Sequence, residues 1–65
     1  MKVVALIHFT SGEVIHERHN SPNLEKARID WHEPMRKGGV VHLASGRIIN
    51  MNNVTLVDVR EDDGA

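Results

Sequence analysis

Five histidines in a chain of 65 residues offer the widest range of chemistry in this sequence. Imidazole binds zinc, copper and nickel, and it exchanges a proton near neutral pH. His16 and His19 lie three residues apart, a spacing that directs two strand side chains to opposite faces. We therefore expect no specific metal site and no cofactor, and a histidine metal-binding protein stays an alternative. His8, His42 and Trp31 are instead expected at an interface between subunits.

Serine is the second candidate for chemistry, in the pairs Ser11-Gly12 and Ser45-Gly46. A serine before a glycine is typical of a hairpin turn, and neither pair has the surroundings of a nucleophile elbow. The sequence has no cysteine, which excludes disulfides, thiolate metal sites and cysteine nucleophiles. Gly38-Gly39 precedes an apolar run typical of a strand, whereas a phosphate-binding glycine loop opens a helix. We expect a protein that is not an enzyme.

Three asparagines, Asn50, Asn52 and Asn53, surround Met51 ahead of the last apolar run. Asparagine tolerates left-handed backbone and bonds to its own chain, so one interpretation is a turn. The other is a polar loop that binds a ligand together with Arg47, because amide groups both donate and accept hydrogen bonds. The sequence leaves both interpretations open.

An internal repeat shows which elements position these residues. Residues 7–15 align without a gap on residues 41–49, at a separation of 45 − 11 = 34 positions. Each copy has Ser-Gly between apolar runs rich in β-branched residues, which predicts a β-hairpin. We predict one hairpin over residues 2–19 and a second over residues 40–50.

The predicted register of the first hairpin follows from its turn. A two-residue turn at Ser11-Gly12 places Phe9 opposite Val14, and both faces of the hairpin then carry apolar side chains. Because a single helix covers one face, the sheet must curl or a second subunit must cover the other face. This argument favours a homo-oligomer.

The segment between the hairpins predicts a helix. Ser21 is a suitable N-cap and Pro22 suits the first helical position. Pro34 disfavours helix at Glu33, so we expect the helix to end near that residue. The apolar residues at helical spacing are Leu24, Ala27, Trp31 and Met35.

A final strand over residues 54–59 completes the order β-β-α-β-β-β. We predict an α+β fold with one helix packed on a curled antiparallel sheet or a small open barrel. Residues 1–60 form a single domain in this prediction, and residues 61–65 form a flexible acidic tail. The predicted core is Val4, Leu6, Ile7, Phe9, Val14, Leu24, Ala27, Trp31, Val41, Leu43, Ile48, Val54, Leu56 and Val57.

Size and charge limit the partners. A chain this short buries only about 60% of its unfolded surface, and association with a second copy is the available stabiliser without cysteine. The net charge of −1 provides no overall field for nucleic acid, which is a possible but disfavoured partner. No apolar run approaches the roughly 20 residues of a membrane span, so we expect no membrane partner and a cytoplasmic protein of bacterial or phage type.

Residues 40–49 and 51–56 together resemble the first strands and the Met-Asn signature of Sm-like RNA-binding proteins. The resemblance implies a ring that binds RNA, with Asn52 at the position of the family's uridine-contacting asparagine. Our leading expectation is a small non-catalytic binding or regulatory module, homo-oligomeric, that binds a protein or a small ligand. An Sm-like RNA- or nucleotide-binding ring is the alternative.

Overall fold

The computed structural model describes residues 1–63 of the chain. These residues form one helix and five strands in antiparallel sheets, which confirms the predicted α+β fold and its element order. The elements are β1 (Lys2–Phe9), β2 (Val14–Asn20), α1 (Leu24–Lys37), β3 (Val40–His42), β4 (Ile48–Asn50), a short 3₁₀ helix η1 (Met51–Asn53) and β5 (Val54–Glu61).

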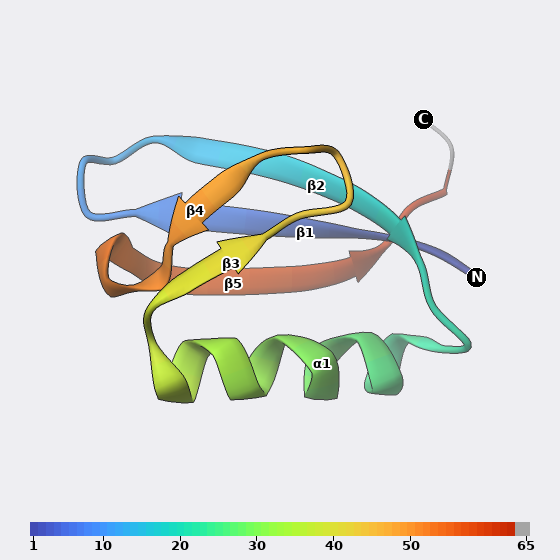
Figure 1. Cartoon of the computed structure of the whole chain (residues 1–65). Helices are drawn as coiled ribbons and strands as arrows, with labels where there is room; N and C mark the ends of the chain where they lie inside the picture. Colours follow the sequence, from blue (N-terminus) through green and yellow to red (C-terminus); the bar gives the residue numbers. More distant parts are fainter. Residues whose placement is uncertain (64–65) are drawn as a thin grey trace.

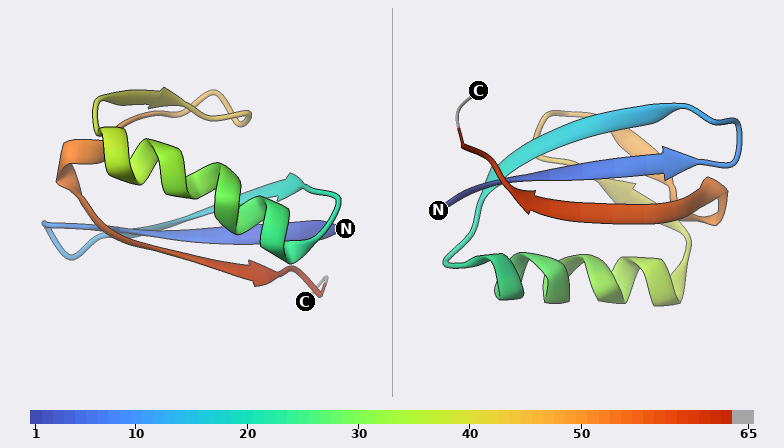
Figure 2. Two further views of the ribbon diagram at one scale, coloured as in Figure 1. Left: turned by 90° about the horizontal axis from the view of Figure 1, so that it is seen from below. Right: turned by 180° about the vertical axis from the view of Figure 1, so that it is seen from behind.

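Strand β1 is the centre of a three-stranded sheet in the order β2-β1-β5, and β3 and β4 form a separate hairpin (Figure 1). Side chains alternate along β1, so Val3, Ala5 and Ile7 all point to one face, where they are fully buried. Helix α1 and the β3–β4 hairpin lie side by side over this same face (Figure 2). The core therefore lies between the sheet on one side and the helix and hairpin on the other.

Both hairpins turn through the same three-residue loop. In the first, Gly12 N donates to Phe9 O (2.9 Å) and Phe9 N donates to Glu13 O (2.9 Å). The second repeats this pattern, with Gly46 N donating to Leu43 O (3.0 Å). The two glycines have φ of 92° and 94°, the left-handed backbone that a type I turn followed by a bulge requires. Each hairpin pairs strands of its own, as the repeat predicts.

The prediction of a two-residue turn at Ser11-Gly12 is wrong by one residue of register. His8 pairs with Val14 and Ile7 with Ile15, whereas a two-residue turn would pair Phe9 with Val14. A shift of one residue moves every side chain to the other face. Five members of the predicted core neither belong to the core nor pack against it: Val4, Leu6, Val14, Ile48 and Leu56. The buried residues missing from that prediction are Val3, Ala5, Ile49, Met51 and Val59.

Helix α1 begins and ends later than the sequence predicts. Its N-cap is Asn23, whose Oδ1 accepts a hydrogen bond from Lys26 N at 2.7 Å, and Ser21 instead donates from its hydroxyl to Asn23 O at 2.9 Å. Pro34 lies inside the helix, because the missing N–H removes only one bond close to its end. The helix ends at Lys37, before Gly38 at φ 74°.

Backbone pairing with β1 continues one residue beyond the end of β5. Asp62 N donates to Lys2 O at 2.9 Å, and the Asp62 carboxylate pairs with Arg18 at 3.3 Å. The ladder therefore enters the segment expected as a tail, of which residues 64 and 65 lie outside the described residues. Within residues 1–63, no helix is long and apolar enough to cross a membrane.

Candidate functional site

A groove of about 280 Å³ lies between α1 and the β3–β4 hairpin, with part of β2 as its floor. We call it the α1–hairpin groove. Strand β2, the helix and the hairpin each contribute to its wall, so segments far apart in the sequence meet there. Its lining residues are Glu17, His19, Asp30, Trp31, Pro34, Val41, His42, Leu43 and Ala44.

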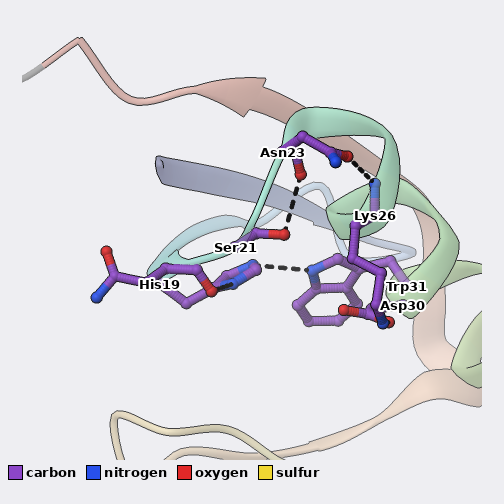
Figure 3. Close-up of polar contacts among 7 residues, drawn as sticks. His19, Ser21, Asn23, Lys26, Asp30 and Trp31 are labelled. Carbon is purple, nitrogen blue, oxygen red and sulfur yellow. Dashed lines mark hydrogen bonds and ion pairs between the residues drawn. The ribbon is translucent and has the colours of Figure 1, made fainter.

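Trp31 of α1 and His19 of β2 both line the groove, and Figure 3 shows their rings facing each other. Trp31 Nε1 donates to His19 Nε2 at 3.4 Å, and the two ring centroids are 6.4 Å apart. The other ring nitrogen, Nδ1 of His19, lies 3.3 Å from Asn20 O. For a neutral ring, an accepting Nε2 and an Nδ1 that faces a carbonyl correspond to the tautomer with its proton on Nδ1. The indole N–H is thus satisfied, and its hydrogen bond restrains the orientation of the ring.

Glu17 is a carboxylate buried to 3% exposure on the core face of β2. Its oxygens accept hydrogen bonds from Ser45 N at 3.2 Å and from Ser45 Oγ at 2.9 Å. Arg47 Nη1 lies 3.8 Å from the same carboxylate and donates to His16 O at 3.2 Å. These contacts compensate a charge that burial would otherwise penalise. They also fix the turn of the β3–β4 hairpin against β2, which sets one wall of the groove.

Asp30 supplies a second carboxylate from the helix. It forms an ion pair and hydrogen bond with Lys26 one helical turn earlier, and both side chains are about half exposed. An exposed pair of this kind contributes at most about 1 kcal/mol to stability. Asp30 is therefore available to a ligand at the rim of the groove.

The asparagines proposed as ligand-binding residues make contacts within the fold. Asn50 Oδ1 accepts from Asn52 N at 3.0 Å and so caps η1, while Asn53 O accepts from Thr10 N at 2.8 Å. Asn52 Oδ1 lies against Gly38, where an added Cβ would be only 2.6 Å away. All three asparagines are exposed, and their role in binding a ligand stays a prediction.

Arg47 contacts β2 through His16 and Glu17, so the structure does not join it to the asparagines in one polar loop.

The three residues predicted at an interface separate into two places. His42 and Trp31 line the α1–hairpin groove. His8 pairs with Val14 and Leu56 in the ladder, and it lies on the opposite face of the sheet from the core. The structure therefore brings His42 close to Trp31 and leaves His8 on another surface.

Sequence reasoning missed Glu17 and His19 as groove residues. The signal that could have found them is strand alternation, because both share the core face with Ile15 once the register is known. Within residues 1–63, no three histidine, aspartate or glutamate side chains gather in a cluster that could hold a metal ion. Comparisons with protein-family models, with curated proteins and with solved structures find no match to this chain.

Proposed function

We propose that this chain is a non-catalytic binding module that holds a small ligand in the α1–hairpin groove. The observation that carries the proposal is the groove itself. It combines apolar walls from Trp31, Pro34, Val41 and Leu43 with a few polar groups, the composition typical of ligand sites in proteins. Its volume of about 280 Å³ is suited to a molecule of one ring or to a group of similar size.

The hydrogen bonds around the groove support binding rather than catalysis. Ser45, which follows the lining residue Ala44, donates from its hydroxyl to the buried carboxylate of Glu17. A serine nucleophile is usually activated by an imidazole within hydrogen-bond reach. Here both ring nitrogens of His19 are engaged, one by Trp31 and one by Asn20 O. The hydrogen bonds of Ser45, Glu17 and His19 are thus made within the protein, where they stabilise the walls of the groove.

Three aromatic fragments of one size, benzamide, benzoate and benzamidine, test this proposal. We expect at least one of them to shift the ¹⁵N–¹H resonances of Trp31 Nε1 and of the Leu43 and Ala44 amides, since these groups line the groove. Ala44→Trp fills the groove and should abolish the shifts. Thr10→Trp, at the equivalent position of the other turn, is the matched control and should leave them unchanged. Binding of none of the three fragments at millimolar concentration would contradict the proposal.

A second proposal concerns the surface of the sheet that faces away from the core, which we call the outer sheet face. Val4 and Leu6 are half-buried at its centre, and Val14 and Leu56 beside them are 40% and 52% exposed. Seen from behind, no described element lies over this face (Figure 2). We propose that a second copy of the chain covers it, because a domain this small gains stability from burying more apolar surface.

Sedimentation velocity of wild type and Leu6→Lys tests the second proposal. The wild-type protein should sediment as an oligomer at micromolar concentration, and a charge at the centre of the outer sheet face should release the monomer. Ile29→Lys is the control, because Ile29 lies on α1 away from the outer sheet face and is 58% exposed. This variant should remain an oligomer. A monomeric wild type would reject this interface and leave the groove proposal unaffected.

A further inference from the structure

We propose that the α1–hairpin groove selects a small planar organic cation, such as an amidinium or a guanidinium. The inference rests on the proposed function, and it adds the chemical class of the ligand. It follows from the charges, the hydrogen-bond capacity and the aromatic surface of the residues that line the groove.

The charge of the lining is negative. Glu17 and Asp30 contribute two carboxylates, and no described lining residue is a lysine or an arginine. A ligand that carries an anionic group would meet these carboxylates without a compensating charge inside the groove. A cation gains from both, and the gain is larger beside the buried Glu17 because the low local dielectric strengthens attraction.

Glu17 has unused capacity to accept hydrogen bonds. A carboxylate has about four lone-pair positions, and Ser45 occupies one on each oxygen. Because Glu17 is one of the residues that line the groove, an N–H donor that reaches its carboxylate can bond to an oxygen that already has one partner. Charge-assisted hydrogen bonds of this kind are about twice as strong as neutral ones. The site therefore favours a ligand with N–H donors on a positive group.

Trp31 lines the groove and is 9% exposed, and this exposed part offers apolar surface to a flat ligand. Its N–H is held by His19, so the indole does not need a hydrogen bond from the ligand. A cation near an indole ring gains attraction from the ring quadrupole, and a flat ligand gains contact area with Val41 and Leu43. Both effects favour a planar cation over a compact ammonium ion.

Two cations of the protein already approach these carboxylates from outside the groove. Lys26 pairs with Asp30, and Arg47 lies 3.8 Å from Glu17. Both cationic side chains are slightly more than half exposed, so each can move into solvent at small cost. A ligand cation can therefore share or replace these contacts while the fold stays intact.

Benzamidine and benzamide provide the direct test, because they have nearly the same shape and differ in charge. We expect benzamidine to bind at least about tenfold more tightly than benzamide, because one charge-assisted hydrogen bond accounts for a difference of that size. Benzoate should bind most weakly, because its charge is negative. Affinity is measured from the shift of the Trp31 indole resonance during titration. The peptide acetyl-Gly-Arg-Gly-amide carries a guanidinium on a peptide. Its affinity shows whether the groove prefers an arginine side chain to a small molecule.

Variants assign the selectivity to the two carboxylates. Glu17→Gln should reduce the ratio of benzamidine affinity to benzamide affinity about tenfold, because it removes the charge that only the cation uses. Asp30 is exposed, so Asp30→Asn should leave the fold intact. This substitution should reduce benzamidine affinity about threefold. Glu33→Gln is the matched control, because it removes the same charge from α1 at a residue that pairs with Arg36. It should change affinity for benzamidine by much less than Asp30→Asn.

The outcomes separate this inference from the proposed function. If benzamide and benzamidine bind equally, the groove is a binding site but the selection of cations is wrong. If none of the fragments shifts the Trp31 resonance, both proposals fail. If the arginine peptide binds more than about tenfold tighter than benzamidine, the occupant is a partner's side chain and the assignment to a small molecule is overturned.

Discussion

The hydrogen bond between Ser45 Oγ and Glu17 provides a quantitative test, because the repeat supplies its own control. Ser45→Ala removes a 2.9 Å bond to a carboxylate whose side chain is 4% exposed. A hydrogen bond to a charged group contributes about 1.5 to 3 kcal/mol to stability. Ser11 occupies the same position in the other turn, where its Oγ accepts only a 3.4 Å contact from the exposed Glu13 N. Ser11→Ala should therefore cost less than about 0.5 kcal/mol.

These losses are large for a domain of this size. At about 0.05 to 0.15 kcal/mol per residue, the chain has roughly 3 to 10 kcal/mol of total stability. Ser45→Ala should lower the urea midpoint by about 1.5 to 3 M at a slope near 1 kcal/mol per M, and Tm by roughly 6 to 24 °C. Urea unfolding followed by circular dichroism measures the two variants side by side. Equal destabilisation by Ser45→Ala and Ser11→Ala would refute the claim that Glu17 fixes the second turn.

Three further predictions test other contacts. Asn23→Ala removes the cap of α1 and should cost about 1 kcal/mol of unfolding free energy in urea; no loss would reject Asn23 as the cap. Gly38→Ala should cost more than about 1 kcal/mol, because the backbone has φ 74° and the new Cβ would meet Asn52 Oδ1 at 2.6 Å; full stability in thermal unfolding would contradict this. In long-range ¹⁵N–¹H spectra of the neutral ring, His19 should have its proton on Nδ1, since Nε2 accepts from Trp31; a proton on Nε2 would exclude that hydrogen bond.

The hairpins could be predicted from the sequence because their signal is local. Ser-Gly between apolar runs defines each turn, and the glycine at φ near 90° is the residue that the turn requires. The register could not be predicted in the same way. Residues 3–7 are apolar without interruption, so alternation does not distinguish the two faces of β1. The predicted core therefore contained residues from both faces of β1, and only Ile7 and Phe9 belong to the core side, whereas Val4 and Leu6 lie on the other face.

The start of the helix was ambiguous for a related reason. Ser21 and Asn23 are both common N-caps, and the capping residue is decided by the path of the chain after β2. Pro34 predicts the end of the helix, yet near the last turn its missing N–H donor has little effect on the helix. Residue type alone did not distinguish these cases.

The candidate site depends on contacts between residues that are far apart in the sequence. Trp31 was expected at an interface, and it lies on the helix side of the groove at 9% exposure. Its polar neighbour His19 comes from β2, and the opposite wall comes from residues 41–44. Glu17 bonds to the turn at Ser45 across 28 positions, and Val41, Leu43 and Ile49 pack the hairpin on the core. Local patterns do not predict where a hairpin docks.

The central claim is that the α1–hairpin groove is a ligand site, and the ¹⁵N–¹H spectrum of the protein titrated with benzamidine tests it most directly. The account predicts saturable shifts at Trp31 Nε1 and at the amides of Leu43 and Ala44, with resonances on the outer sheet face unchanged. Shifts confined to the outer sheet face, or no shifts at millimolar benzamidine, would contradict it.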